Sequence, residues 1–126
     1  MVESSSGKPF DLGDRTFLFA KDVRAFVRKL RRTISNEEDI RQLVRSSGSV
    51  GANYIEANES LGAKDCLLRF RTSRKEAKES AFWLRLLDVE EGGALAEARK
   101  QLVAEAGELV LILSAIIKKR ESAPGA

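Results

Sequence analysis

Positively charged side chains recur at every seventh position between residues 64 and 85. On a helix this spacing places them along one face, about 10 Å apart because each residue rises roughly 1.5 Å. We expect no carboxylate within this cationic row, which consists of Lys64, Arg71, Lys78 and Arg85, with Lys75 beside them. Such a row can follow a phosphate backbone without reading bases. The alternative is an ordinary solvated helix face, and Phe82 alone gives little support to base stacking.

A second concentration of positive charge lies between residues 15 and 32, which contain seven Lys or Arg and only one Asp. We expect Arg24 and Arg28 of this segment to assist the cationic row in binding RNA or DNA. Residues 88–108 hold six acids against two bases, so the net charge of +3 conceals a polarised surface. The alternative function is therefore a protein-interaction scaffold, whose basic faces meet an acidic partner or the acidic segment of a neighbouring subunit.

Polar side chains at helical spacing form a further set beside the predicted core: Ser49, Asn53, Glu56, Glu76, Glu79 and Trp83. Carboxylates on two helices of a bundle can hold metal, which leaves an all-carboxylate magnesium site as a remote alternative. The favoured interpretation is that Glu56, Glu76 and Glu79 pair with arginines such as Arg45 and Arg69, or with an arginine of another subunit. The set would then specify helix register or assembly.

The sequence contains no histidine. This excludes a Ser-His-Asp triad, histidine-based acid–base catalysis and nearly all imidazole-containing zinc or di-iron sites. We therefore predict a protein without enzymatic activity, cofactor or metal. The single Cys66 is expected to be a small buried hydrophobe in a reducing compartment. Because no apolar run has the length of a membrane span or the pattern of a signal peptide, we expect a cytoplasmic protein without a membrane partner.

The 126 residues suffice for one domain, and no proline occurs between Pro9 and Pro124. Apolar residues at intervals of three and four predict helices over residues 14–32, from Ser35 or Asn36 to about residue 57, over 63–89 and over 94–120. Short turns join them, which predicts an all-α, antiparallel up-down-up-down four-helix bundle over residues 14–120. Residues 1–13 and 121–126 are expected to be flexible tails.

Small residues are concentrated in the second predicted helix, between Ser46 and Ala52. Glycine in a helix costs about 1 kcal/mol relative to alanine, so we expect a neighbouring helix to approach closely there. The alternative is a helix break at Gly48. In the fourth helix, Leu95, Leu102, Leu109 and Ile116 form a heptad seam. The apolar stripes of the second and fourth helices are wide, which suggests apolar surface left for another subunit.

Two segments carry a resemblance to a known family: QLVRSSGSVGANYIEANES, residues 42–60, and KDCLLRFRTSRKEAKESAFWLRLL, residues 64–87. They resemble the second and third helices of the four-helix-bundle proteins encoded in intervening sequences of bacterial large-subunit rRNA genes. The shared pattern is Ser-x-Gly-Ser-x-x-x-Asn-x-x-Glu followed by Lys-Glu-x-x-Glu, and the match extends over residues 14–120. The sequence departs from the pattern at Cys66, where phenylalanine is usual, and at Thr72-Ser73, where an Ile-Ala pair is usual.

The resemblance implies an antiparallel bundle that assembles as a homopentamer without established enzymatic activity. The family's signature polar positions fall on Ser49, Asn53, Glu56, Lys75, Glu76, Glu79 and Trp83. A related accessory protein of diversity-generating retroelements binds nucleic acid and a reverse transcriptase, which suggests these as partners by analogy. From residues and resemblance together we predict a non-enzymatic homo-oligomer that binds RNA or DNA through its basic helix faces.

Overall fold

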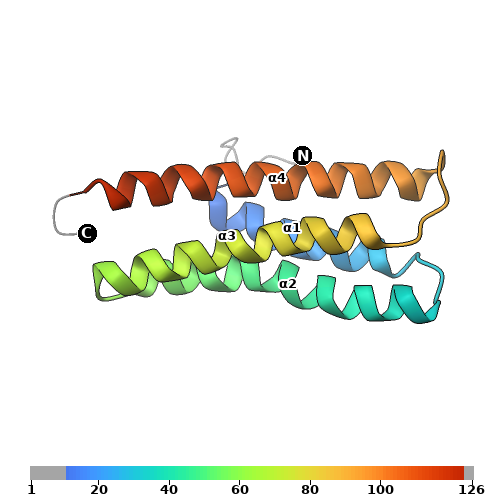
Figure 1. The fold of residues 1–126 in the computed structure, drawn as a ribbon, viewed down its shortest axis with the longest axis horizontal. Coiled ribbons are helices and arrows are strands. Elements are labelled where there is room, and N and C mark those ends of the chain that lie inside the picture. The colour runs from blue at the N-terminus through green and yellow to red at the C-terminus, as the bar shows by residue number, and fades with distance from the viewer. Residues whose placement is uncertain (1–10, 124–126) are drawn as a thin grey trace.

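The computed structural model describes residues 11–123, and residues 1–10 and 124–126 lie outside the described part. Four helices account for most of it: α1 (Leu12–Val27), α2 (Ile34–Glu59), α3 (Ala63–Leu86) and α4 (Ala94–Glu121). Figure 1 shows them side by side along the long axis of the molecule. Within residues 11–123 there is no strand, and no helix there is long and apolar enough to cross a bilayer.

The helices form a closed ring of neighbours. α1 contacts α2 and α4, α3 contacts the same two helices, and neither diagonal pair makes contact. Short connections at residues 28–33, 60–62 and 87–93 reverse the chain each time (Figure 1). The predicted antiparallel up-down-up-down four-helix bundle is therefore confirmed.

The beginnings of α1 and α2 differ from the prediction. Asp11 caps α1 by accepting a hydrogen bond from the Asp14 N–H at 2.8 Å, so the helix begins two residues before the expected boundary of the tail 1–13. Thr33 caps α2 by accepting from the Asn36 N–H at 3.1 Å, so neither Ser35 nor Asn36 is the cap. At the far end of the chain, α4 continues to Glu121, one residue into the expected tail 121–126.

Two helices end earlier than predicted. α1 stops at Val27 instead of Arg32, because a tight turn in which the Leu30 N–H donates to the Val27 carbonyl directs Leu30 into the core. α3 stops at Leu86 instead of Val89. Leu87 and Val89 are both buried, and residues two apart point to the same side only in an extended chain.

The core runs along the centre of the bundle. In α3 the side chains of Cys66, Phe70, Ser73, Ala77 and Leu84 are buried, whereas Ala81 on the same predicted face is half-buried. In α4 the predicted seam is confirmed in part. Leu102 and Leu109 are buried, whereas Leu95 and Ile116 are only half-buried. Intervals of three and four complete the buried line of α4, which consists of Leu102, Ala106, Leu109, Leu113 and Ile117.

The small residues of α2 lie where its neighbours approach most closely. The helix continues through Gly48, so the alternative of a break there is wrong. A Cβ atom on Gly51 would stand 3.1 Å from the Thr16 Oγ1 of α1. Towards α3, the Ser46 and Ser80 hydroxyls share a buried hydrogen bond of 2.9 Å, and the Ser73 hydroxyl donates to the Val50 carbonyl at 2.6 Å. The predicted close approach is confirmed on both sides of α2.

Candidate nucleic-acid interface

The outward surface of α3 carries the predicted cationic row. We call it the α3 face and define it as Lys64, Leu68, Arg71, Lys75, Lys78, Phe82, Arg85 and Leu86, all of which are exposed. Lys64, Lys75, Lys78 and Arg85 form no ion pair with any carboxylate of residues 11–123. Their charges are therefore open to solvent and to a ligand.

Arg71 departs from the expectation of an unopposed row. Its guanidinium forms an ion pair with the Glu121 carboxylate of α4. The pair arises because α4 continues to Glu121, which brings a carboxylate across the α3–α4 seam. Both side chains are about half exposed, and surface pairs of this kind contribute roughly 0–1 kcal/mol. A polyanion can therefore displace Glu121 at small cost.

Three large apolar side chains stand among these cations. Leu68, Phe82 and Leu86 have exposed fractions of 57%, 53% and 51%. The Phe82 ring packs edge-on against Trp83, with ring centroids 5.0 Å apart and an interplanar angle of 78°. This T-shaped contact is a favoured aromatic geometry and holds the exposed ring in place. The α3 face thus combines fixed apolar groups with unpaired positive charge.

A shallow hollow of about 380 Å³ lies at the α3–α4 seam, beside the α3 face. We call it the α3/α4 hollow; its lining residues are Arg85, Ala96, Arg99, Lys100 and Val103. Arg99 is anchored there because its guanidinium donates to the Leu87 carbonyl. Arg99 and Lys100 were not predicted as site residues, because in the sequence they are only the two bases of an acidic segment. The sequence could have indicated these residues, because two antiparallel helices joined at residues 87–93 place Arg85 opposite the first turns of α4.

The structure does not bring Arg24 and Arg28 to the α3 face. Both lie in or just after α1, which is diagonal to α3 in the bundle. Arg24 is half-buried, and its guanidinium donates to the Ala20 carbonyl at 3.1 Å and to the Val44 carbonyl at 3.4 Å. It therefore links α1 to α2, while Arg28 is exposed.

The predicted polar set lies along the α2–α3 seam. Glu76 is buried and receives two hydrogen bonds from Arg45, at 3.3 and 3.4 Å, while a Glu79 oxygen lies 3.7 Å from the same guanidinium. The expected pairing with Arg45 is confirmed. Asn53 accepts from Arg69 at 3.4 Å and donates to the Ser49 carbonyl at 2.9 Å. These contacts tie the two helices in one register.

Two members of the set make fewer contacts. Glu56 is exposed, and its carboxylate has no ionic partner within residues 11–123. The Trp83 indole N–H is buried without an acceptor in the described part of the chain. Nowhere among the described residues do three or more carboxylate or thiol side chains gather in an arrangement that could hold a metal ion. The three glutamates therefore do not form the magnesium cluster considered as an alternative.

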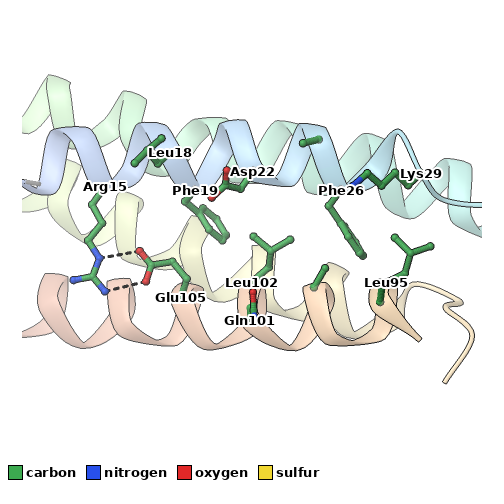
Figure 2. Close-up of a pocket in the computed structure, with 13 residues that line it drawn as sticks. Arg15, Leu18, Phe19, Asp22, Phe26, Lys29, Leu95, Gln101, Leu102 and Glu105 are labelled. Atoms are coloured by element: carbon green, nitrogen blue, oxygen red, sulfur yellow. Dashed lines mark hydrogen bonds and ion pairs between the residues drawn. The ribbon is translucent and has the colours of Figure 1, made fainter. Parts of the chain in front are cut away.

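A larger apolar groove of about 890 Å³ separates α1 from α4. Figure 2 shows Phe19 and Phe26 of α1 pointing into it, opposite Leu95 and Leu102 of α4. Arg15 closes one end by donating two hydrogen bonds to Glu105, at 2.8 and 2.9 Å. This bonding raises the pKa of Arg15, against the opposing effect of burial. Exposed apolar side chains are present on α2 and α4 as expected, at Ile55 and Leu111, and the groove adds apolar surface between α1 and α4 that was not predicted.

These features define the class of the protein as an antiparallel four-helix bundle with a cationic face on its third helix. The chain is similar to a solved structure of a protein of unknown function from the S23 ribosomal protein family of Bacteroides thetaiotaomicron. The two share 26% sequence identity and superpose with a TM-score of 0.71, over 84% of this chain and 94% of the other. No protein-family model matches the sequence, and no curated protein is significantly similar to it.

Proposed function

We propose that this chain is a non-enzymatic, oligomeric helical-bundle protein that binds the backbone of RNA or DNA through the α3 face. The observation that carries the proposal is the set of four exposed cations, Lys64, Lys75, Lys78 and Arg85, that no carboxylate of the described residues neutralises. Phosphates neutralised by such side chains release condensed counterions, which is the main source of non-specific affinity for nucleic acid.

The proposed relationship to the proteins of rRNA intervening sequences agrees with the similarity to a member of the S23 ribosomal protein family. The protein in that solved structure has no known function, so the similarity supports the four-helix fold and carries no information about activity. Assembly into a homo-oligomer, a pentamer by resemblance, would repeat the α3 face and add avidity without any new contact. The apolar α1/α4 groove and the exposed Leu111 of α4 are surfaces that a neighbouring subunit could cover.

Fluorescence anisotropy with a labelled RNA at low salt tests this function. The test variant carries Lys64→Glu, Lys75→Glu, Lys78→Glu and Arg85→Glu. A matched control carries Lys21→Glu, Lys29→Glu, Arg31→Glu and Arg32→Glu, which changes net charge equally on the α1 side of the bundle. We expect the α3 variant to lose affinity roughly tenfold or more and the control to lose much less. Equal losses would show that only net charge matters, as for an ordinary solvated face.

The second candidate function is a protein-interaction scaffold without nucleic-acid binding, by analogy an accessory subunit of a reverse transcriptase. The observation that favours it is the α1/α4 groove, because apolar helix-lined grooves accept amphipathic helices of partner proteins. Pull-down from nuclease-treated lysate separates the two functions. A protein partner that is retained without nucleic acid, and lost on Ala25→Glu at an exposed position of the groove, would favour the scaffold.

A further inference from the structure

The α3 face carries more apolar surface than binding to a phosphate backbone requires. Phe82 is 53% exposed, and the residues one turn away from it are Lys78, Glu79, Arg85 and Leu86. A Glu79 carboxylate oxygen lies 3.7 Å from the Arg45 guanidinium of α2, so the charges left without an ionic partner beside the ring are the two cations. Side chains three or four apart on a helix stand roughly 5–6 Å from one another. An aromatic ring flanked by cations at this distance is the arrangement on which unpaired bases stack, since every base offers an apolar face.

The Phe82 ring is also held in one orientation in the absence of a ligand. Its edge-on contact with Trp83, at 5.0 Å between centroids, restricts the rotation that an exposed phenylalanine would otherwise have. A side chain that is ordered before binding loses less entropy when the ligand arrives.

The α3/α4 hollow supplies a place for a phosphate next to this ring. Three of its five lining residues are cations, and none is a carboxylate. Arg85 belongs both to the hollow and to the α3 face, three residues after Phe82, so the two sites adjoin. Arg99 is fixed by its bond to the Leu87 carbonyl. A guanidinium fork that is already positioned suits the planar recognition of phosphate oxygens.

From this juxtaposition we infer that the α3 face binds single-stranded rather than duplex nucleic acid, with a base on Phe82 and a phosphate in the α3/α4 hollow. The inference rests on the proposed function and narrows its ligand. In a duplex the bases are stacked inside. Phe82 and Leu86 would then face only phosphates and sugars and would contribute no binding free energy through contact with bases. A single strand exposes its bases to the ring while its backbone follows the cations.

An anionic membrane is the other ligand that mixed basic and apolar side chains can attract. Here the apolar groups do not form a continuous stripe. Leu68 and Phe82 are about 21 Å apart along the helix at roughly 1.5 Å per residue, with Arg71, Lys75 and Lys78 between them. A helix inserts into a bilayer through a continuous apolar face. A single strand, in which bases and phosphates alternate, instead matches a face on which apolar and cationic side chains alternate.

The test compares a labelled oligothymidylate with a duplex of the same length, at the same salt, for the full-length protein. We expect tighter binding of the single strand. Phe82→Ala removes the ring and keeps every charge, and we expect it to weaken single-strand binding roughly 5- to 150-fold, the loss measured for one stacked base. Phe17→Ala is the matched control, because Phe17 is 65% exposed on the diagonal helix α1. Phe82→Trp should restore binding.

The hollow is tested separately with Arg85→Gln and Lys100→Gln, each compared with Lys21→Gln. We expect each substitution in the hollow to lower the slope of log affinity against log salt by roughly 0.7, the value of one single-strand phosphate, and the control to leave the slope unchanged. Circular dichroism confirms that each variant is folded.

The possible failures are distinct. If duplex binds as tightly as the single strand and Phe82→Ala changes neither, the inference is wrong while backbone binding by the α3 face stands. If neither nucleic acid binds at low salt, the proposed function fails and the inference fails with it. Binding to vesicles containing phosphatidylserine, lost on Phe82→Ala and without any affinity for oligothymidylate, would identify a membrane surface and overturn both.

Discussion

Asn36 joins both turns at one end of the bundle through a single buried side chain. Its exposed fraction is 1%, and its amide nitrogen donates to the Arg31 carbonyl at 3.0 Å and to the Asp88 carbonyl at 3.1 Å. Its amide oxygen accepts from the Asp88 N–H at 2.9 Å. The sequence pattern indicates Asn36 only as a possible start of the second helix. Its function as a link depends on Asn36 and Asp88, 52 residues apart in the sequence, meeting in space, which no local pattern encodes.

We predict that Asn36→Ala destabilises the protein by about 2–4 kcal/mol, because three partly buried backbone groups lose their partner together. Urea denaturation monitored by circular dichroism measures the change. Asn58→Ala is the matched control, since Asn58 is exposed near the end of α2 and should change stability by less than about 0.5 kcal/mol. Equal stability of the two variants would show that the link at Asn36 is not formed.

Two of the helical glycines, Gly51 and Gly107, should respond oppositely to alanine. A Cβ on Gly107 meets nothing within 4 Å, so Gly107→Ala should stabilise α4 by about 0.5–1 kcal/mol. A Cβ on Gly51 meets Thr16, which is buried and whose hydroxyl donates to the Gly13 carbonyl at 3.1 Å, so it cannot move away freely. We predict that Gly51→Ala destabilises the fold by about 1 kcal/mol.

Thermal unfolding of the two glycine variants measures both effects in the same assay. Stabilisation of equal size at both positions would contradict the close approach of α1 to α2. The sequence already indicated this contact, because glycines within a long helical period have to be compensated by packing.

The ion pair between Arg15 and Glu105 links the two helices that the α1/α4 groove separates (Figure 2). We predict that Glu105→Gln costs about 1 kcal/mol, because the side chains are only 27% and 29% exposed and the paired hydrogen bonds are charge-assisted. Glu56→Gln is the control: Glu56 is exposed on α2 and forms no ion pair within residues 11–123. Chemical denaturation gives the difference, and equal stability of the two variants would contradict the link.

The helices and the cationic row were predictable because each depends on spacing within one segment. Lys64, Lys78 and Arg85 share a face for the same reason that Phe70, Ala77 and Leu84 share the core. The helix ends were not predictable, since Leu30, Leu87 and Val89 leave helical geometry to reach a core built by distant segments. The pairing of Arg71 with Glu121 and the α3/α4 hollow also depend on the register between two helices.

The apolar groove of the bundle lies between α1 and α4, its first and last helices. We predict that a neighbouring copy covers exposed apolar surface and that light scattering gives about five times the chain mass of 13.9 kDa. Leu111→Glu, which places a charge on an exposed position of α4, should lower that mass if the α4 surface is covered. A wild-type monomer at micromolar concentration would contradict assembly and the avidity argued from it.

The central claim is that the α3 face acts as a site for a polyanion, and the salt dependence of binding tests it most directly. Affinity for a single-stranded oligonucleotide is measured from low to moderate salt for wild type and for the variant with Lys64, Lys75, Lys78 and Arg85 changed to Glu. We predict that log affinity falls linearly with log salt. In the variant the fall should be shallower, with a slope smaller in magnitude by roughly 3, about 0.7 for each of the four lost contacts. A slope that is the same in both proteins, or no binding at low salt, would contradict it.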